Sequence, residues 1–189
     1  MKPVLFIFLL FCLHASAQSI TELKDSSIYY TGWGGKADRT RVMRKSDSTL
    51  LSAGQYKSIA NDRYRLFEVN DSGYLNGSFK DFFNERNYQE RIYDNGLLIR
   101  EYYKAGSKIL SESFDSTVSV LIYNSKKNRW DPRLKTVTVE KAYDPRGNIS
   151  ICRYLKGPYT AYTIYKYKQG ILISKKTPFY QEFSKRKPY

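Results

Sequence analysis

The sequence predicts an all-β fold: a single elongated, twisted antiparallel meander sheet of stacked β-hairpin repeats, with about 23 residues per repeat. Three observations support this prediction. Turn glycines recur at a fixed step, short strand-like runs lie between them, and no long stretch shows the 3.6-residue apolar period of a helix. A period in the twenties indicates one supersecondary unit that is stacked repeatedly.

Composition agrees with a thin sheet. The chain has 189 residues, of which 18 are tyrosine and 10 are phenylalanine. Tyrosine suits half-buried positions, because its ring packs while its hydroxyl reaches water. This favours β-structure with exposed faces over a thick two-layer core.

The first residues have the features of a secretory signal peptide. Lys2 gives a positive start, Val4 to Leu13 form an apolar run, and Ala15-Ser16-Ala17 resembles a cleavage site. We therefore expect residues 1–17 to be a signal peptide cleaved after Ala17, and the protein to be exported to the periplasm or secreted.

Two other interpretations of this segment are weaker. The apolar run is shorter than the roughly 18 residues that a membrane span needs. Cys12 follows Leu10-Phe11 and lacks the small residues that precede a lipoprotein cysteine. Lipid attachment at Cys12 is therefore the lesser alternative.

Beyond the signal peptide we expect a single domain. Residues 18–48 should form an irregular capping segment, in which Trp33 covers the end of the sheet. Residues 49–176 should form the repeat domain, with a polar, proline-containing insertion near 124–134. Residues 177–189 form a basic C-terminal tail.

Glycine spacing defines the repeat. The step from Gly73 to Gly96 equals the step from Gly147 to Gly170. Asp94-Asn95-Gly96 is typical of a tight hairpin turn, where glycine can adopt a positive φ. The predicted structural turn glycines are Gly54, Gly73, Gly77, Gly96, Gly106, Gly147, Gly157 and Gly170. Phe79 and Tyr102 share the same step and are expected to be equivalent strand positions.

Two segments carry a resemblance to a known repeat. They are N-D-S-G-Y-L-N-G-S-F-K-D-F-F-N, residues 70–84, and I-Y-D-N-G-L-L-I-R-E-Y-Y-K-A-G-S-K, residues 92–108. The pattern resembles the bacterial variant of the MORN repeat over roughly Ser52 to Ser113. Tyr143 to Gly157 is similar to a degenerate copy and also to the YD repeat. The resemblance implies a curled or twisted antiparallel sheet used as a binding scaffold, in proteins that include antitoxin-like and envelope-associated members.

The residue inventory argues against catalysis. Removing the signal peptide removes His14, the only histidine, and leaves Cys152 as the one thiol. No Ser-His-Asp triad, Cys-His pair, zinc motif or P-loop can then be assembled. We expect no catalytic, cofactor-binding or metal-binding residues. A single cysteine forms no internal disulfide, and Cys152 lies in a strand-like run that predicts a packed, unreactive thiol.

Carboxylates keep one enzymatic alternative open, a carbohydrate-active enzyme that uses an acidic pair. The candidates by residue type are Asp81, Glu85, Asp94, Glu101, Asp115, Asp131, Glu140 and Asp144. Asp94 and Asp144 have a simpler explanation in the turns that they occupy.

Charge is the strongest functional hint. The expected mature chain has 31 Lys and Arg against 18 Asp and Glu, a formal charge of +13. Basic residues alternate with aromatic ones toward the C-terminus. Such surfaces can bind nucleic acid, but export argues against that partner. A protein partner or an anionic envelope surface, lipid headgroup or glycan, remains.

We expect an exported, non-catalytic binding or scaffold protein. The candidate binding face comprises Tyr56, Phe79, Tyr102, Tyr103, Tyr162 and Tyr165, and the candidate anion-binding residues are Lys175, Lys176, Lys185, Arg186 and Lys187. An antitoxin-like or immunity protein that neutralises a toxin is the alternative. A plainer role for the lysines also stays open: keeping the sheet soluble and guarding its edges.

Overall fold

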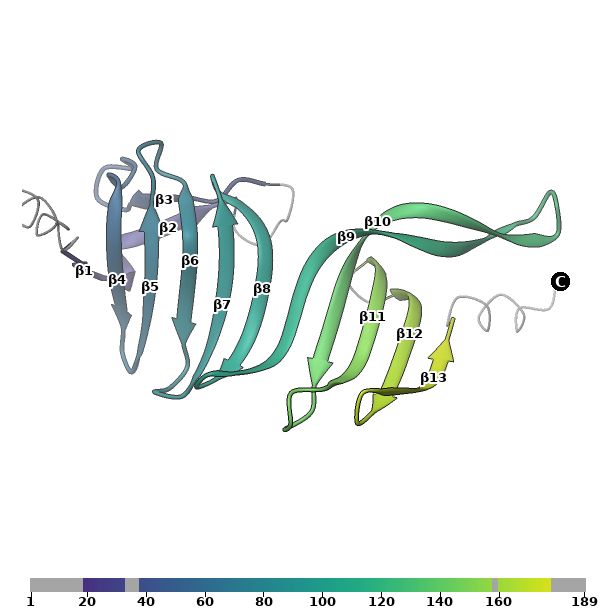
Figure 1. Cartoon of the computed structure of the whole chain (residues 1–189). Helices are drawn as coiled ribbons and strands as arrows, with labels where there is room; N and C mark the ends of the chain where they lie inside the picture. Colours follow the sequence, from purple (N-terminus) through teal and green to yellow (C-terminus); the bar gives the residue numbers. More distant parts are fainter. Residues whose placement is uncertain (1–18, 33–37, 158–159, 178–189) are drawn as a thin grey trace, which may run out of the picture.

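The computed structural model describes residues 19–32, 38–157 and 160–177. The predicted signal peptide, Trp33 and the tail residues Lys185, Arg186 and Lys187 lie outside these ranges. The described chain forms an eleven-stranded sheet and a separate two-stranded sheet (Figure 1). It contains no α-helix, and hence none long and apolar enough to cross a membrane.

The large sheet is the predicted antiparallel meander, and the all-β prediction is confirmed. Its strands β4 to β13 follow one another in chain order, and each pairs with the next. They are β4 (Gly54–Ala60), β5 (Arg63–Val69), β6 (Leu75–Phe82), β7 (Asn87–Asp94), β8 (Leu97–Ala105), β9 (Lys108–Asn124), β10 (Arg129–Tyr143), β11 (Ile149–Gly157), β12 (Thr160–Lys168) and β13 (Ile171–Lys176).

Five of the eight expected turn glycines lie in turns or bends between strands. Gly73, Gly96, Gly147 and Gly170 have φ of 75°, 83°, 86° and 81°. Asn95 and Gly96 both have positive φ and join β7 to β8 in a two-residue turn, as the Asn-Gly pair predicts. Gly54, Gly77 and Gly157 were expected in turns, but they lie in strands. Gly54 is the first residue of β4, Gly157 is the last residue of β11, and Gly77 lies inside β6, where the register with β5 shifts.

Residues 18–48 are more regular than expected. β1 (Thr21–Lys24) pairs in parallel with β4 at one end of the sheet, and the 3-10 turn η1 (Asp25–Ser27) follows it. β2 (Ile28–Thr31) and β3 (Arg41–Arg44) form the two-stranded sheet. We call β2 and β3 the cover, because they lie against one face of the large sheet.

The predicted insertion near 124–134 is also strand for most of its length. Only residues 125–128 form a turn, and β9 and β10 pair on both sides of it. Pro132 fits within β10 because the ribbon has only two strands there, so each strand has an edge without a partner. We call residues 118–135 of this hairpin the arm.

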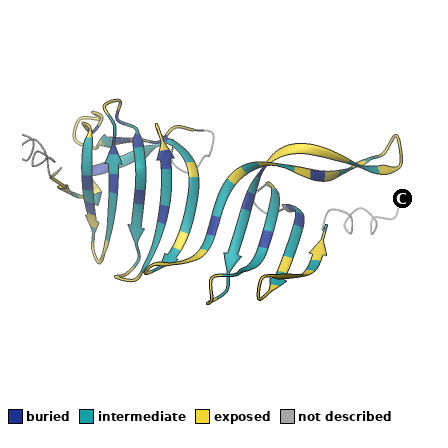
Figure 2. Ribbon diagram, in the orientation of Figure 1, coloured by how far each residue is buried: buried dark blue, intermediate teal, exposed yellow. Residues whose placement is uncertain are grey.

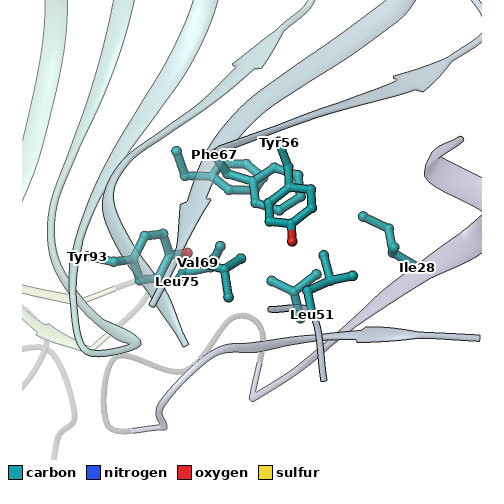
Figure 3. Close-up of a cluster of buried hydrophobic side chains, with 9 residues drawn as sticks. Ile28, Leu51, Tyr56, Phe67, Val69, Leu75 and Tyr93 are labelled. Carbon is teal, nitrogen blue, oxygen red and sulfur yellow. The ribbon is translucent and has the colours of Figure 1, made fainter. Parts of the chain in front are cut away.

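A first hydrophobic core lies between the cover and β4 to β7. Ile28 and Leu51 lie opposite Tyr56 and Phe67 (Figure 3). Phe79 lies at the centre of this core and is only 1% exposed. Its ring stacks on the ring of Phe67, with the two centroids 5.7 Å apart. The face of the sheet that bears these residues is called the cover face.

A second cluster lies on the other face, at the other end of the sheet. It combines buried Val137, Val139 and Cys152 with Val120 of the arm. β9 contacts β12 as well as its sheet neighbours, because the arm bends across the sheet (Figure 1). Buried positions in the arm and in β11 and β12 are visible as dark bands in Figure 2.

Candidate functional site

The face opposite the cover face is organised by one registered row of residues. Successive strands pair these positions side by side, so one side chain per strand joins the row. The row runs through Glu22, Lys57, Leu66, Lys80, Glu90, Tyr102, Glu112, Lys141, Cys152, Tyr165 and Lys175. We call this face the ladder face.

Glu90 is a buried carboxylate in the row, with 8% of its surface exposed. Ser78 Oγ donates a hydrogen bond to its Oε1 at 2.7 Å, Lys104 Nζ pairs with its Oε2, and Lys80 Nζ lies 3.9 Å away. Burial alone would raise the pKa of Glu90. The hydrogen bonds from Lys104 and Ser78 and the lysine charges outweigh it, so the pKa lies below its ordinary value.

Glu112 repeats this arrangement two strands further along. It is also 8% exposed. Tyr143 Oη donates a hydrogen bond to it at 2.7 Å, and Lys141 Nζ and Arg100 lie at 3.1 and 3.9 Å. Burial opposes ionisation here too, but the bonds from Tyr143 and Lys141 set the pKa of Glu112 below its ordinary value. Burial, and then the bond to Glu112, raise the pKa of Tyr143.

Aromatic rings fill the ladder face beside this row. Tyr64 stacks on Phe82 and Phe82 on Tyr88, with ring centroids 4.3 and 4.9 Å apart. Lys104 Nζ lies 4.9 Å from the centroid of Tyr102, within range of a cation–π interaction. The carboxylates, lysines and rings of this part of the face form ion pairs, cation–π contacts and ring stacks with one another, so we assign them a role in stabilising the sheet.

A shallow hollow of about 230 Å³ opens where β8 to β11 run side by side. Ser111, Ser113 and Ala142 are among its lining residues, together with Glu101 and Glu140. Two of the candidate carboxylates thus meet at one place. Each is already paired with an arginine: Glu101 with Arg91 at 3.4 Å, and Glu140 with Arg153 at 3.5 Å. Each of the two carboxylates is therefore engaged by a guanidinium group.

The six aromatic residues of the candidate binding face do not lie together. Tyr56 and Phe79 are buried in the first core, so they cannot contribute to an exposed face. Tyr102 lies on the ladder face, and Tyr103, its neighbour in β8, points to the cover face.

Tyr162 and Tyr165 pack against the second cluster. Lys175 Nζ lies 5.6 Å from the ring centroid of Tyr165. Lys176 is exposed in the next position of β13. The structure therefore brings two of the expected aromatic residues and two of the expected lysines to the same end of the sheet.

This end of the sheet has an extreme charge bias. Asp144 is the last acidic residue before Glu182. Seven basic residues lie between Asp144 and Pro178, and no acidic residue accompanies them: Arg146, Arg153, Lys156, Lys166, Lys168, Lys175 and Lys176. We call β11 to β13 with their turns the basic end. A count of acidic residues along the chain would have located it from the sequence.

The described residues give little support to metal binding or to thiol chemistry. In the ranges that the structure describes, no group of three His, Cys, Asp or Glu side chains could hold a metal ion. Cys152 is buried, and burial raises the pKa of its thiol, which disfavours the reactive thiolate. No protein-family model and no curated protein matches this chain.

Proposed function

We propose that the chain is an exported, non-catalytic binding module that holds an acidic protein partner or an anionic envelope component at its basic end. The observation that carries this proposal is the charge segregation. Seven basic residues and no acidic one occupy Arg146 to Thr177. Arg153 pairs with Glu140 of β10, so the excess comes from the remaining residues, whereas Glu90 and Glu112 neutralise basic neighbours on the ladder face.

Unbalanced charge on one end of a rigid sheet creates a long-range field that attracts a partner of opposite sign. Lysines that already pair with carboxylates contribute little to such a field. Lys175 and Lys176 lie where no carboxylate is near in the sequence. The resemblance to repeat scaffolds that bind partners agrees with this proposal.

The test measures binding of the purified protein to polyglutamate and, separately, to anionic lipid vesicles. We expect binding to at least one probe, and it should weaken as salt shortens the Debye length from about 30 Å at 0.01 M to about 8 Å at 0.15 M. Replacing Lys175 and Lys176 with glutamine should weaken it several-fold.

The arm offers a matched control. Lys126 and Lys127 are also adjacent and exposed. Asp131 lies near Lys127: the hydrogen bond from Asn124 lowers the pKa of Asp131, and the charge of Lys127 adds to this effect. The Lys126→Gln/Lys127→Gln variant should bind almost as well as the natural chain. Equal losses in both variants, or no binding to either probe, would contradict the proposal.

A further inference from the structure

β13 is the last strand of the large sheet in the described part of the chain, where only one of its edges is paired. It pairs with β12, and no other described strand lies beyond it. The backbone N–H and C=O groups of its outer edge can therefore accept another strand. Natural proteins usually protect such an edge with charge, a covering segment or a very short strand.

The first half of β13 lacks that protection. Ile171, Leu172 and Ile173 are 70%, 50% and 61% exposed. β1, at the opposite end of the sheet, is different: it has four residues, of which Glu22 and Lys24 are charged. The unprotected edge of the sheet is therefore the one at β13.

Charge indicates what could pair with this edge. β13 ends in Lys175 and Lys176, and its neighbour β12 carries Lys166 and Lys168. Two copies of the basic end would bring like charges together, which disfavours a dimer through β13. A strand that carries carboxylates would meet complementary charge.

We propose that β13 is a strand-addition site that takes an extended acidic segment of a partner protein as a further strand. This inference rests on the proposed function and names the way in which the basic end holds its partner. Backbone hydrogen bonds along the outer edge would supply affinity, and contacts with the exposed aliphatic side chains and the lysines would supply selectivity.

The test uses a synthetic peptide of alternating glutamate and valine with blocked ends, and the full chain. A second peptide has the same sequence but carries N-methyl groups on alternate backbone nitrogens, which removes donors along one edge and keeps the charge. We expect the first peptide to bind and the second to bind at least ten-fold more weakly.

A protein variant tests the same surface from the other side. Ile171→Thr/Ile173→Thr keeps β-branched side chains but reduces apolar contact, and should weaken binding of the first peptide several-fold. The control is Leu134→Thr in the arm, where the leucine is 73% exposed, and it should leave binding unchanged. Amide exchange in β13 should slow when the first peptide is bound.

Three results would overturn strand addition. Equal binding of the two peptides would leave charge attraction, and hence the proposed function, as the full explanation. Sedimentation could show a dimer of the natural chain that is absent in the Ile171→Thr/Ile173→Thr variant. That result would identify a second copy of the chain as the partner of the β13 edge. Peptide binding only after truncation at Thr177 would identify the chain's own C-terminal segment. Absence of binding to both polyglutamate and anionic vesicles would instead contradict the proposed function.

Discussion

Glu90 in β7 and Glu112 in β9 have matching surroundings. Each is almost fully buried, accepts a hydrogen bond from a hydroxyl and faces two basic side chains. A buried ion pair is costly to form, and removing one partner leaves the other charge without compensation. These two residues should therefore be more sensitive to substitution than the ion pairs at the surface.

We expect Glu112→Gln to lower the free energy of unfolding by about 1.5–3 kcal/mol, the range for hydrogen bonds to charged groups. Chemical denaturation followed by circular dichroism measures the change. Glu140→Gln is the matched control, because Glu140 pairs with Arg153 at 3.5 Å with about 40% of its side chain exposed. Its effect should stay within about 1 kcal/mol. A loss as large as that of Glu112→Gln would show that burial is not the cause.

The same carboxylates predict a pH dependence. Their folded-state pKa values lie below the ordinary value of 4.5, so below about pH 5 the unfolded chain binds more protons than the folded chain. The contribution of these two carboxylates to the free energy of unfolding is complete above about pH 5 and is lost as the pH falls through their folded-state pKa values.

Measured stability should therefore decline between about pH 5 and pH 3, and less steeply in the Glu112→Gln variant. Denaturation midpoints at several pH values give both slopes. Parallel curves for the two proteins would contradict the assignment to Glu112.

At the scale of the hairpin, the turn glycines differ in how closely the chain surrounds them. A Cβ on Gly96 would lie 2.7 Å from Tyr74 Cδ1 and 3.0 Å from Thr40 backbone atoms, whereas a Cβ on Gly147 would meet nothing within 4 Å. Gly96 also connects the two sheets, because Thr40 N–H donates to its carbonyl oxygen at 2.8 Å.

Gly147→Ala should cost only the strain of a positive φ, about 1 kcal/mol. Gly96→Ala adds a steric clash with the segment before β3 and should cost clearly more. Thermal unfolding of the two variants compares them directly. Similar losses would show that the contact at Thr40 gives way easily.

The sequence predicted the hairpins and their turns, because glycine spacing and Asn-Gly chemistry act locally. It did not predict which face each residue occupies. Phe79 and Tyr102 are separated by one step of the repeat, yet they belong to different rows of paired residues. Phe79 pairs with Arg91, which pairs with Glu101. Tyr102 pairs with Glu90, which pairs with Lys80. The pairing of β7 with β8 shifts by one residue between Ile92 and Tyr93. Because side chains alternate, that shift sends Phe79 and Tyr102 to opposite faces.

The arm and the cover were missed for a related reason. Both are pairs of strands that pack across a face of the large sheet, and a repeat pattern does not record such packing. Val120 is buried because the arm bends over β12, and Pro132, which suggested an insertion, lies in a strand. The basic end could have been found from the sequence, since it depends only on where acidic residues stop.

At the scale of the molecule, the described residues form two separate hydrophobic clusters joined by a single continuous sheet. In stacked repeats each unit is stabilised chiefly by its neighbours, so the two ends can open separately. Phe79→Ala should cost roughly 3–5 kcal/mol in the first core. Amide exchange should quicken in β4 to β7 more than in β10 to β12.

Val139→Ala serves as the reciprocal variant, because Val139 is buried in the second cluster. It should accelerate exchange in β10 to β12 more than in β4 to β7. Uniform acceleration across the sheet in both variants would show one cooperative unit instead of two.

The cover and the arm lie on opposite faces, near opposite ends of the sheet. Each end therefore has one side packed and one side open, and the open sides point in opposite directions. A body resting flat against the open side at β4 to β7 cannot touch the open side at β11 to β13. Covering one of the open sides would therefore leave the other exposed to solvent.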